Sequence, residues 1–331
     1  MPILMGKEVG PIGFGMMGLT WGAEPIPEER AFATLKAALA NGMNFWNGGE
    51  FYGPPENNSL VLLERYFAKY PEDADKVVLS IKGGVEISVH SHEPDGSPEG
   101  TRRSIDNCLR QLKGRKKIDI FEFGRRDPRV PMSVTFGVIE NEYVKTGKIG
   151  GISLSEVRAE TIHEAVKITK IVGVEVELSL FSREILENGV ADACAQYDIP
   201  LIAYSPIGRG FLAGQYKTIE DVKPALRSWP WFQPGNFEAN LQLATQVEEL
   251  AKKKGVTPAQ LAINWTIRVS TWRKGAPKTI IPIPGSTTVA RVNENGAKVE
   301  ISDEEMAYID EIIAKFKPKG TRYPEHIPVN T

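Results

Sequence analysis

The chain of 331 residues contains a tyrosine and a lysine whose side chains would do chemistry together if the fold made them neighbours. Tyr52 lies in the glycine-rich segment 47–53, Asn-Gly-Gly-Glu-Phe-Tyr-Gly, and Lys82 ends a short apolar run. A phenol with an ordinary pKa of about 10 is a poor acid at neutral pH, but a nearby ammonium group favours the phenolate and lowers that pKa. Beside Lys82, Tyr52 would become a workable proton donor. Taken separately, Tyr52 is also explained by packing and Lys82 by a solvated strand end.

A second segment has the residue types of an anion site. Residues 283–295 read Ile-Pro-Gly-Ser-Thr-Thr-Val-Ala-Arg-Val-Asn-Glu-Asn. Small hydroxyl residues and free backbone N–H groups at a helix start bind anions, and Arg291, one turn later, can add a bidentate charge to a phosphate. An ordinary Ser/Thr helix cap followed by an exposed arginine would have the same sequence, so the residues alone leave both interpretations open.

The elements that must position these residues alternate between short apolar runs and longer amphipathic segments, which is typical of repeated βα units and a parallel sheet. The expected strands are Gly10–Gly15, Asn44–Asn47, Val77–Lys82, Ile118–Phe123, Gly151–Ser155, Gly173–Ser179, Leu201–Ser205 and Thr279–Ile283. The expected helices between and after them are Pro27–Ala40, Asn58–Tyr70, Gly100–Leu112, Ser133–Lys145, Ala159–Lys170, Glu184–Tyr197, Pro258–Val269 and Thr288–Asn295. Several end at Gly or Pro, and a ninth helix, Asp303–Phe316, follows a capping box that begins at Ser302.

Eight such units favour a closed (β/α)8 TIM barrel with extra helices, formed by a single domain over 1–331. A doubly wound sheet is disfavoured, because the sequence has no dinucleotide-type Gly-x-Gly-x-x-Gly followed by a ribose-binding acid. The segment 206–238 after strand seven is too long for an ordinary βα loop and contains Trp229, Trp231 and Phe232. Such a loop would act as a lid over the site or pack its aromatic side chains against the barrel rim.

Composition narrows the class of protein. The chain has 40 Lys+Arg and 42 Asp+Glu, a net charge of −2, which argues against a nucleic-acid binder. No signal peptide and no apolar run long enough for a membrane span is readable, and both Cys108 and Cys194 fall in helical patterns, so we expect a cytoplasmic protein with reduced, buried thiols. No cluster has metal-ligand spacing, and the loop containing His90 and His92 is expected to be solvated, so no metal is predicted.

Taken together in this order, these motifs resemble the aldo-keto reductase superfamily over essentially the whole chain. Segment 13–18, Gly-Phe-Gly-Met-Met-Gly, is similar to the family's first strand and loop, and Tyr52 and Lys82 match its catalytic Tyr and Lys. Segment 205–214, Ser-Pro-x-Gly-Arg-Gly-x-Leu-x-Gly, resembles the loop that folds over the cofactor pyrophosphate. Segment 285–295 resembles the site for the 2′-phosphate and adenine of NADPH. The resemblance implies a TIM barrel that binds NADPH and acts on a small-molecule aldehyde, with no membrane or nucleic-acid partner.

The same resemblance assigns roles to individual residues. Tyr52, Lys82 and Asn47 would be catalytic, Ser155 and Glu156 would hold the nicotinamide carboxamide, and Tyr204 would lie against the ring. Glu175 stands where many relatives have Gln and would also bind the cofactor. The remaining cofactor residues implied are Gly15, Met16, Met17, Ser205, Pro206, Gly208, Gly210, Leu212, Gly285, Ser286, Thr287, Arg291, Glu294 and Asn295.

The sequence departs from the family at two of its four usual catalytic positions. Asn47 replaces the usual Asp, so it can hydrogen-bond Lys82 but brings no negative charge, and Lys82 would act on Tyr52 undiluted. Gly124 replaces the usual His, which would open volume and remove a donor to the carbonyl oxygen. Glu122, two residues before Gly124 on the same strand face, is interpreted as a structural residue.

Within the superfamily, the segments around Tyr52, Ser155, Glu175 and Ser286 look most like the fungal pyridoxal reductase branch. This resemblance implies reduction of pyridoxal to pyridoxine, with aromatic residues near the mouth as substrate contacts: Trp21, Trp46, Phe51 and Phe123. Three alternatives remain: a general aldehyde reductase, an NADP(H)-binding sensor of the same fold with weak reductase activity, and a barrel for another phosphorylated ligand. The sequence gives no indication of the oligomeric state.

Overall fold

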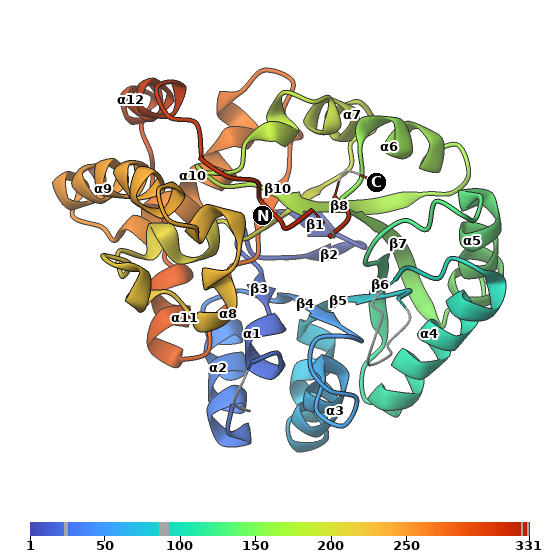
Figure 1. The fold of residues 1–331 in the computed structure, drawn as a ribbon. Helices are drawn as coiled ribbons and strands as arrows, with labels where there is room; N and C mark the ends of the chain where they lie inside the picture. The colour runs from blue at the N-terminus through green and yellow to red at the C-terminus, as the bar shows by residue number, and fades with distance from the viewer. Residues whose placement is uncertain (23–25, 86–92, 326, 330) are drawn as a thin grey trace.

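A parallel sheet of eight strands forms the centre of the computed structural model, which describes residues 1–22, 26–85, 93–325, 327–329 and 331 (Figure 1). The strands are β3 (Phe14–Gly15), β4 (Phe45–Gly49), β5 (Val78–Gly83), β6 (Ile118–Phe123), β7 (Ile149–Ser155), β8 (Ile171–Glu177), β9 (Leu201–Tyr204) and β10 (Ile280–Pro282). Each strand pairs with the next one along the chain. The expected eight-stranded barrel is confirmed.

The seam between β3 and β10 closes the barrel with few hydrogen bonds. Gly13 N donates to Pro282 O at 2.9 Å, and Gly15 N donates to Pro284 O at 3.2 Å. The two prolines have no N–H to return, which limits this ladder. β3 has two residues, whereas the sequence pattern predicted a strand over Gly10–Gly15.

The alternation of side chains along the strands separates two buried layers. Inward-facing residues such as Phe45, Val78, Ile120 and Ile202 form the apolar core inside the barrel, and the outward-facing residues pack under the helices. Side chains two residues apart share a face of a strand. Counting forward from the inner apolar layer, the carboxyl ends of the strands therefore present a set of mostly polar inward side chains: Asn47, Lys82, Glu122, Ser155, Glu175 and Tyr204.

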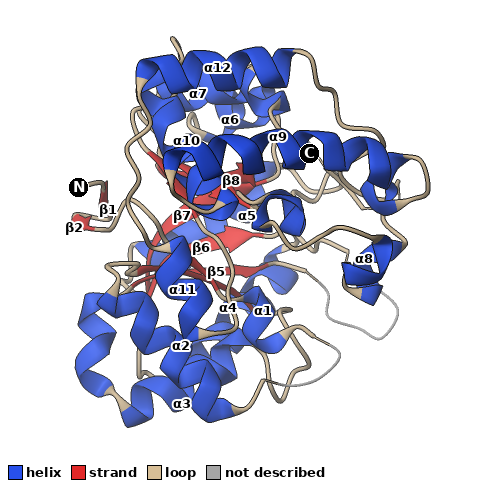
Figure 2. Ribbon diagram, turned by 90° about the vertical axis from the view of Figure 1, so that its left-hand side faces the viewer, coloured by secondary structure: helices blue, strands red, loops and turns tan. Residues whose placement is uncertain are grey.

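A short hairpin that the sequence analysis did not predict covers the opposite end of the barrel. It consists of β1 (Ile3–Leu4) and β2 (Lys7–Glu8), and its Leu4 joins the inner apolar core. In Figure 2 this hairpin lies on one side of the molecule, and α8 and the C-terminus lie on the other. The turn residues Met5 and Gly6 both have positive φ, but Met-Gly is not one of the usual hairpin signals, so the pattern is silent here.

Helices surround the barrel. They are α1 (Met17–Thr20), α2 (Glu28–Ala40), α3 (Ser59–Lys69), α4 (Pro98–Leu112), α5 (Met132–Ile139), α6 (Ala159–Ala165), α7 (Val190–Gln196), α8 (Pro224–Arg227), α9 (Asn236–Lys254), α10 (Pro258–Trp272), α11 (Val289–Asn295) and α12 (Asp303–Ala314). The capping box at Ser302 is present. The helix expected from Glu184 begins instead at Val190, because Gly189 has a φ of +87°. The nineteen-residue α9 was not predicted.

The long segment after β9 packs its aromatic residues into the core. Trp231 and Phe232 are buried, and the Phe232 ring stacks on Phe211 at 4.9 Å between centroids. Trp229 remains partly exposed, with its ring 5.2 Å from that of Tyr323. Of the two alternatives, the structure therefore favours packing against the barrel for Trp231 and Phe232.

The described residues add two findings on the expected environment. No helix within them is long and apolar enough to cross a membrane. Cys108 and Cys194 are both buried and free, as the helical patterns predicted.

Candidate active site

Four inward side chains meet at the carboxyl ends of β4, β5, β6 and β8. The Nζ of Lys82 lies 3.1 Å from Glu122 Oε1, forms an ion pair with Glu175 Oε1, and donates to Asn47 Oδ1 at 3.4 Å. Asn47 Nδ2 in turn donates to Glu175 Oε2 at 2.6 Å. Lys82, Glu122 and Glu175 are at most 5 % exposed. We call these four residues, with Tyr52, the Lys82 cluster.

Tyr52 lies over this cluster because glycines allow the loop after β4 to fold back. The Lys82 Nζ is 5.9 Å from the centre of the Tyr52 ring. A Cβ on Gly49 would lie 2.9 Å from that ring, so the ring packs directly on the strand end. Gly53, with a φ of +109°, completes the turn, and Thr20 Oγ1 donates to the Tyr52 carbonyl at 2.6 Å. The structure thus brings together the tyrosine and lysine identified in the sequence.

The electrostatics of Tyr52 differ from the expectation. Burial raises the pKa of Tyr52 to about 12 and outweighs the positive charge of Lys82, and the carboxylates of Glu175 and Glu122 raise this pKa further. The expected net lowering is therefore wrong. Tyr52 stays protonated at neutral pH, and the protonated phenol is the form that can give a proton to a substrate oxygen.

A second expectation is also corrected: although Asn47 carries no charge, Lys82 has negative partners in Glu122 and Glu175. Burial on its own would lower the pKa of Lys82, but the charges of Glu122 and Glu175 more than compensate, so this pKa lies above its ordinary value. Glu122, interpreted from the sequence as a structural residue, forms an ion pair with Lys82. Burial and the neighbouring Glu175 charge raise the pKa of Glu122 to about 8.

The position where the family usually has His is filled by a neighbouring aromatic ring. A Cβ on Gly124 would lie 3.0 Å from Phe51 Cζ and 3.2 Å from its Cε1. The volume that Gly124 was expected to open is therefore occupied by Phe51. Trp21, half exposed, packs against both Phe51 and Tyr52, with ring centroids 6.3 and 5.7 Å away.

Two of the four aromatic residues expected to contact substrate are not brought to this mouth. Trp46 follows the outward face of β4, is fully buried, and packs on Phe67 of α3 with its Nε1 bonded to the Met43 carbonyl. Phe123 also faces outward and packs edge-on against Phe121. The error arises from alternation, because the residues next to Asn47 and Glu122 must face the other way.

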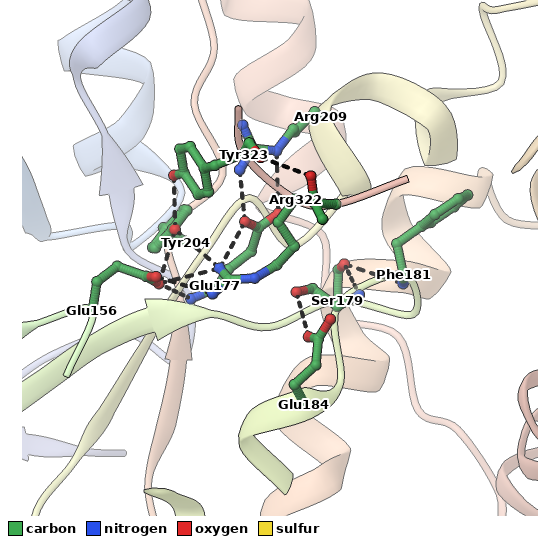
Figure 3. Close-up of polar contacts among 11 residues, drawn as sticks. Glu156, Glu177, Ser179, Phe181, Glu184, Tyr204, Arg209, Arg322 and Tyr323 are labelled. Carbon is green, nitrogen blue, oxygen red and sulfur yellow. Dashed lines mark hydrogen bonds and ion pairs between the residues drawn. The ribbon is translucent and has the colours of Figure 1, made fainter. Parts of the chain in front are cut away.

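A second charged cluster lies at the same end of the barrel, over β7, β8 and β9 (Figure 3). Arg322 bonds Glu156 Oε2 at 3.0 Å and Glu177 Oε2 at 3.2 Å, and Arg209 bonds Glu177 Oε2 at 2.7 Å. The Tyr204 hydroxyl donates to Glu156 at 2.9 Å and pairs with the Tyr323 hydroxyl at 2.8 Å. We call these six residues the Arg322 cluster: Glu156, Glu177, Tyr204, Arg209, Arg322 and Tyr323.

The C-terminal segment completes the Arg322 cluster and was missed by the sequence analysis. Thr331 N donates to the Glu156 carbonyl at 2.8 Å, and Arg125 Nε donates to the Pro328 carbonyl at 2.7 Å. One sequence signal could have predicted it: Glu175 and Glu177 share the inner face of a buried strand, and two buried carboxylates require cations nearby.

The residues expected to bind the cofactor on β7 and β8 have different surroundings. Ser155 Oγ is buried and has no hydrogen-bond partner among the described residues, whereas Glu156 is bonded to Arg322 and Glu175 to Lys82. Glu156 and Ser205 both have positive φ, +52° and +50°. Strained non-glycine residues of this kind cluster at functional sites.

The two expected cofactor loops flank the mouth. In the first, Gly208 and Gly210 have positive φ, and Leu212 is buried beyond Pro206. In the second, Gly285 forms a parallel β-bridge with Gly15, and a Cβ at position 15 would lie 2.8 Å from the Ile283 carbonyl oxygen. The next residue, Met16, donates its backbone N–H to the Asn47 carbonyl at 2.8 Å. The structure therefore places the segment containing Met16 and the exposed Met17 beside residues 285–295.

Within residues 285–295, polar side chains contact one another. Asn295 Nδ2 donates to the buried Ser286 Oγ at 2.9 Å, and Arg291 Nη1 donates to Glu294 Oε2 at 2.6 Å. Arg30 of α2 donates through Nε to the Thr287 carbonyl at 2.8 Å, which adds a second guanidinium that the sequence analysis did not identify.

The chain forms a (β/α)8 barrel with Tyr52 and Lys82 together at its carboxyl end, and it belongs to the Aldo/keto reductase family of oxidoreductases, whose sequence model matches residues 11–314. It is 42% identical to "Probable pyridoxal reductase 2" of Schizosaccharomyces pombe, over 99% of this chain and 98% of that protein. It is 37% identical to "Putative pyridoxal reductase" of Saccharomyces cerevisiae, over 94% and 95% of the two chains. The solved glycerol dehydrogenase of Gluconobacter oxydans has the same fold, with a TM-score of 0.79, 22% identity, and 97% and 96% coverage.

Proposed function

We propose that this protein reduces pyridoxal to pyridoxine with NADPH, with Tyr52 as the proton donor and Lys82 as its partner. The observation that carries the proposal is a buried, protonated Tyr52 packed beside Lys82 at the carboxyl end of the barrel. The proposed substrate rests on the similarity to two fungal proteins named as pyridoxal reductases. A general aldehyde reductase would use the same residues.

The residues present fit a nicotinamide cofactor in part. Ser155 Oγ is a buried hydroxyl without a partner among the described residues, which suits a carboxamide. Ser286, Thr287 and Arg291 offer hydroxyl and guanidinium groups to a 2′-phosphate, which favours NADPH over NADH. Glu175, expected at a cofactor position, already accepts from Lys82 and Asn47 within the Lys82 cluster. When bound, NADPH supplies the hydride that reduces the aldehyde carbon.

The protein's own contribution is a placed proton and a shaped mouth. The Tyr52 hydroxyl would protonate the aldehyde oxygen as negative charge develops there, and the raised pKa of Tyr52 keeps that proton available through the neutral range. Trp21 and Phe51 pack around Tyr52 and offer apolar surface to an aromatic aldehyde.

A sensor with weak reductase activity is the second candidate. The observation that favours it is the Phe51 ring at the family's His position, which leaves Tyr52 without that second donor. The paired Tyr52 and Lys82 favour the enzyme, because a binding module has no chemical need for an acid at the mouth.

The test follows the absorbance of NADPH as the purified protein reduces pyridoxal, compared with a panel of other aldehydes and with NADH. We expect Tyr52→Phe to lower kcat by about 10²–10⁴, the usual contribution of a positioned general acid, while NADPH binding measured by fluorescence is retained. Tyr308→Phe, on the exposed face of α12, is the matched control. Full turnover by Tyr52→Phe would refute the assignment, and tight NADPH binding without turnover by the unmodified protein would support the sensor.

A further inference from the structure

Asn47 and Glu175 form a matched pair around Lys82. Glu175 receives Lys82 Nζ on Oε1 and Asn47 Nδ2 on Oε2, so each of its oxygens has a donor from the protein. Asn47 uses both ends of its amide, because its Oδ1 accepts from Lys82 at 3.4 Å while its Nδ2 donates to Glu175. The three side chains close a ring of hydrogen bonds at the bottom of the mouth.

The charges explain why position 47 holds an amide. An aspartate there would place a carboxylate oxygen at the site of Nδ2, 2.6 Å from the Glu175 oxygen, with no proton between two buried anions. An amide removes this repulsion and supplies a donor. The carboxylate that accepts from both Lys82 and Asn47 therefore comes from β8, and the neutral hydrogen-bonding group comes from β4.

We propose that Glu175 is the anionic positioning residue of the active site, which holds Lys82 Nζ beneath Tyr52, and that Asn47 orients the Glu175 carboxylate. This inference rests on the proposed function in taking Tyr52 and Lys82 as the proton-donating pair. It assigns the Glu175 carboxylate to the Lys82 cluster in place of the cofactor role that the sequence suggested, because an ionised carboxylate only accepts hydrogen bonds and its two oxygens here accept from Lys82 and Asn47.

The charged and titratable groups around Glu175 come from three other elements: Lys82 on β5, Glu122 on β6 and Tyr52 in the loop after β4. The negative charge of Glu175 opposes ionisation of Tyr52. Replacing it by a neutral amide is therefore expected to lower the pKa of Tyr52 by on the order of one unit.

The test is a charge exchange between positions 47 and 175, read first in the protein without cofactor. Glu175→Gln, Asn47→Asp and the double variant are compared by thermal denaturation and by the ultraviolet absorbance of tyrosinate during an alkaline titration, with Tyr52→Phe subtracted. We expect each single variant to melt lower, by about 5 °C, since Glu175→Gln removes a buried carboxylate from beside Lys82 and Asn47→Asp adds another one beside Glu175. The Tyr52 titration should move to lower pH in Glu175→Gln and to higher pH in Asn47→Asp.

The double variant Asn47→Asp/Glu175→Gln restores one carboxylate and one amide, so it should regain most of both losses. Additive losses in the double variant, or an unchanged titration in Glu175→Gln, would overturn the proposal. Glu50→Gln is the matched control, because Glu50 is a buried carboxylate that bonds Ser104 and Asn107 instead of Lys82. It should leave the Tyr52 titration in place, and Asn47→Asp should not rescue it.

Activity then separates this inference from the proposed function. The pH profile of kcat/KM for pyridoxal should shift in Glu175→Gln in the same direction as the Tyr52 titration and return in the double variant. If the unmodified protein reduces no aldehyde, the proposed function fails while the titration still decides the role of Glu175. If it reduces pyridoxal and Glu175→Gln changes neither titration nor profile, only the positioning role fails.

Discussion

The Lys82 cluster and the Arg322 cluster lie at the same end of one barrel, are both buried, and differ in charge balance. In the first, Lys82 faces Glu122 and Glu175, which is formally 1 − 2 = −1. In the second, Arg209 and Arg322 face Glu156 and Glu177, which is formally 2 − 2 = 0.

This difference decides where protons can move. In the balanced cluster, Arg322 outweighs the effect of burial and holds the pKa of Glu156 below its ordinary value, so the carboxylate keeps its charge. In the unbalanced cluster, burial and the charge of Glu175 raise the pKa of Glu122 to about 8. We therefore expect the cluster with excess negative charge to respond to pH, and the balanced cluster to act as a fixed anchor for the C-terminal segment.

The largest expected effect is on stability, from breaking the balanced cluster. Arg322→Leu removes a cation from Glu156 and Glu177, which are at most 1 % exposed, and we expect the free energy of unfolding to fall by about 3–5 kcal/mol, as for other broken buried pairs. Chemical denaturation measures this change. Arg102→Leu is the control, because its bidentate pair with Glu142 is about two-fifths exposed and screened by solvent, so its loss should cost far less. Equal, small losses would show that the Arg322 cluster is no anchor.

A smaller effect is expected on the pH dependence of stability, and it tests the Lys82 cluster against the Arg322 cluster. The pKa of Glu122 is raised on folding, so its contribution to stability is complete below the unfolded pKa of about 4.3 and is lost as pH rises toward 8. Melting temperature measured across this range should therefore fall less steeply in Glu122→Gln than in the unmodified protein. Glu156→Gln serves as the comparison: the pKa of Glu156 is lowered, so its contribution is lost only in acid. Parallel curves for Glu122→Gln and the unmodified protein would contradict the assignment.

Much of the fold was predictable, because periodicity and stop signals act locally. Alternating βα units gave the eight strands, and the Ser302 capping box correctly marked the start of α12. The β1–β2 hairpin could not be predicted, because its turn has no characteristic residues and its Leu4 becomes buried only when the barrel exists. α9 was obscured by the aromatic residues and prolines of the preceding segment.

The parts of the site in which one residue type performs the chemistry could be predicted from the sequence. The parts that depend on contacts between side chains from distant strands could not. Tyr52 and Lys82 could be paired from their positions at strand ends. The ion pairs of Lys82 with Glu122 and Glu175 depend on which inward side chains meet across the barrel, so they appear only in three dimensions. Trp46 was wrongly expected to contact substrate, because an aromatic residue next to a site residue on a strand faces the opposite side of the sheet.

The smallest expected effect lies at the edge of the Lys82 cluster, where Phe51 occupies the space beside Gly124. Gly124→Ala places a Cβ about 3.0 Å from the Phe51 ring, which is partly exposed and can move by a few tenths of an ångström. We expect a loss of less than about 1 kcal/mol in unfolding free energy and a raised KM for pyridoxal with little change in kcat. Gly137→Ala, in α5 with open space around it, should instead stabilise the protein by about 0.5–1 kcal/mol without affecting KM. Because the loss is attributed to Phe51, adding Phe51→Ala should abolish the destabilisation by Gly124→Ala. A loss as large as that of Arg322→Leu would mean that the mouth around Tyr52 is held as rigidly as the charged anchor opposite it.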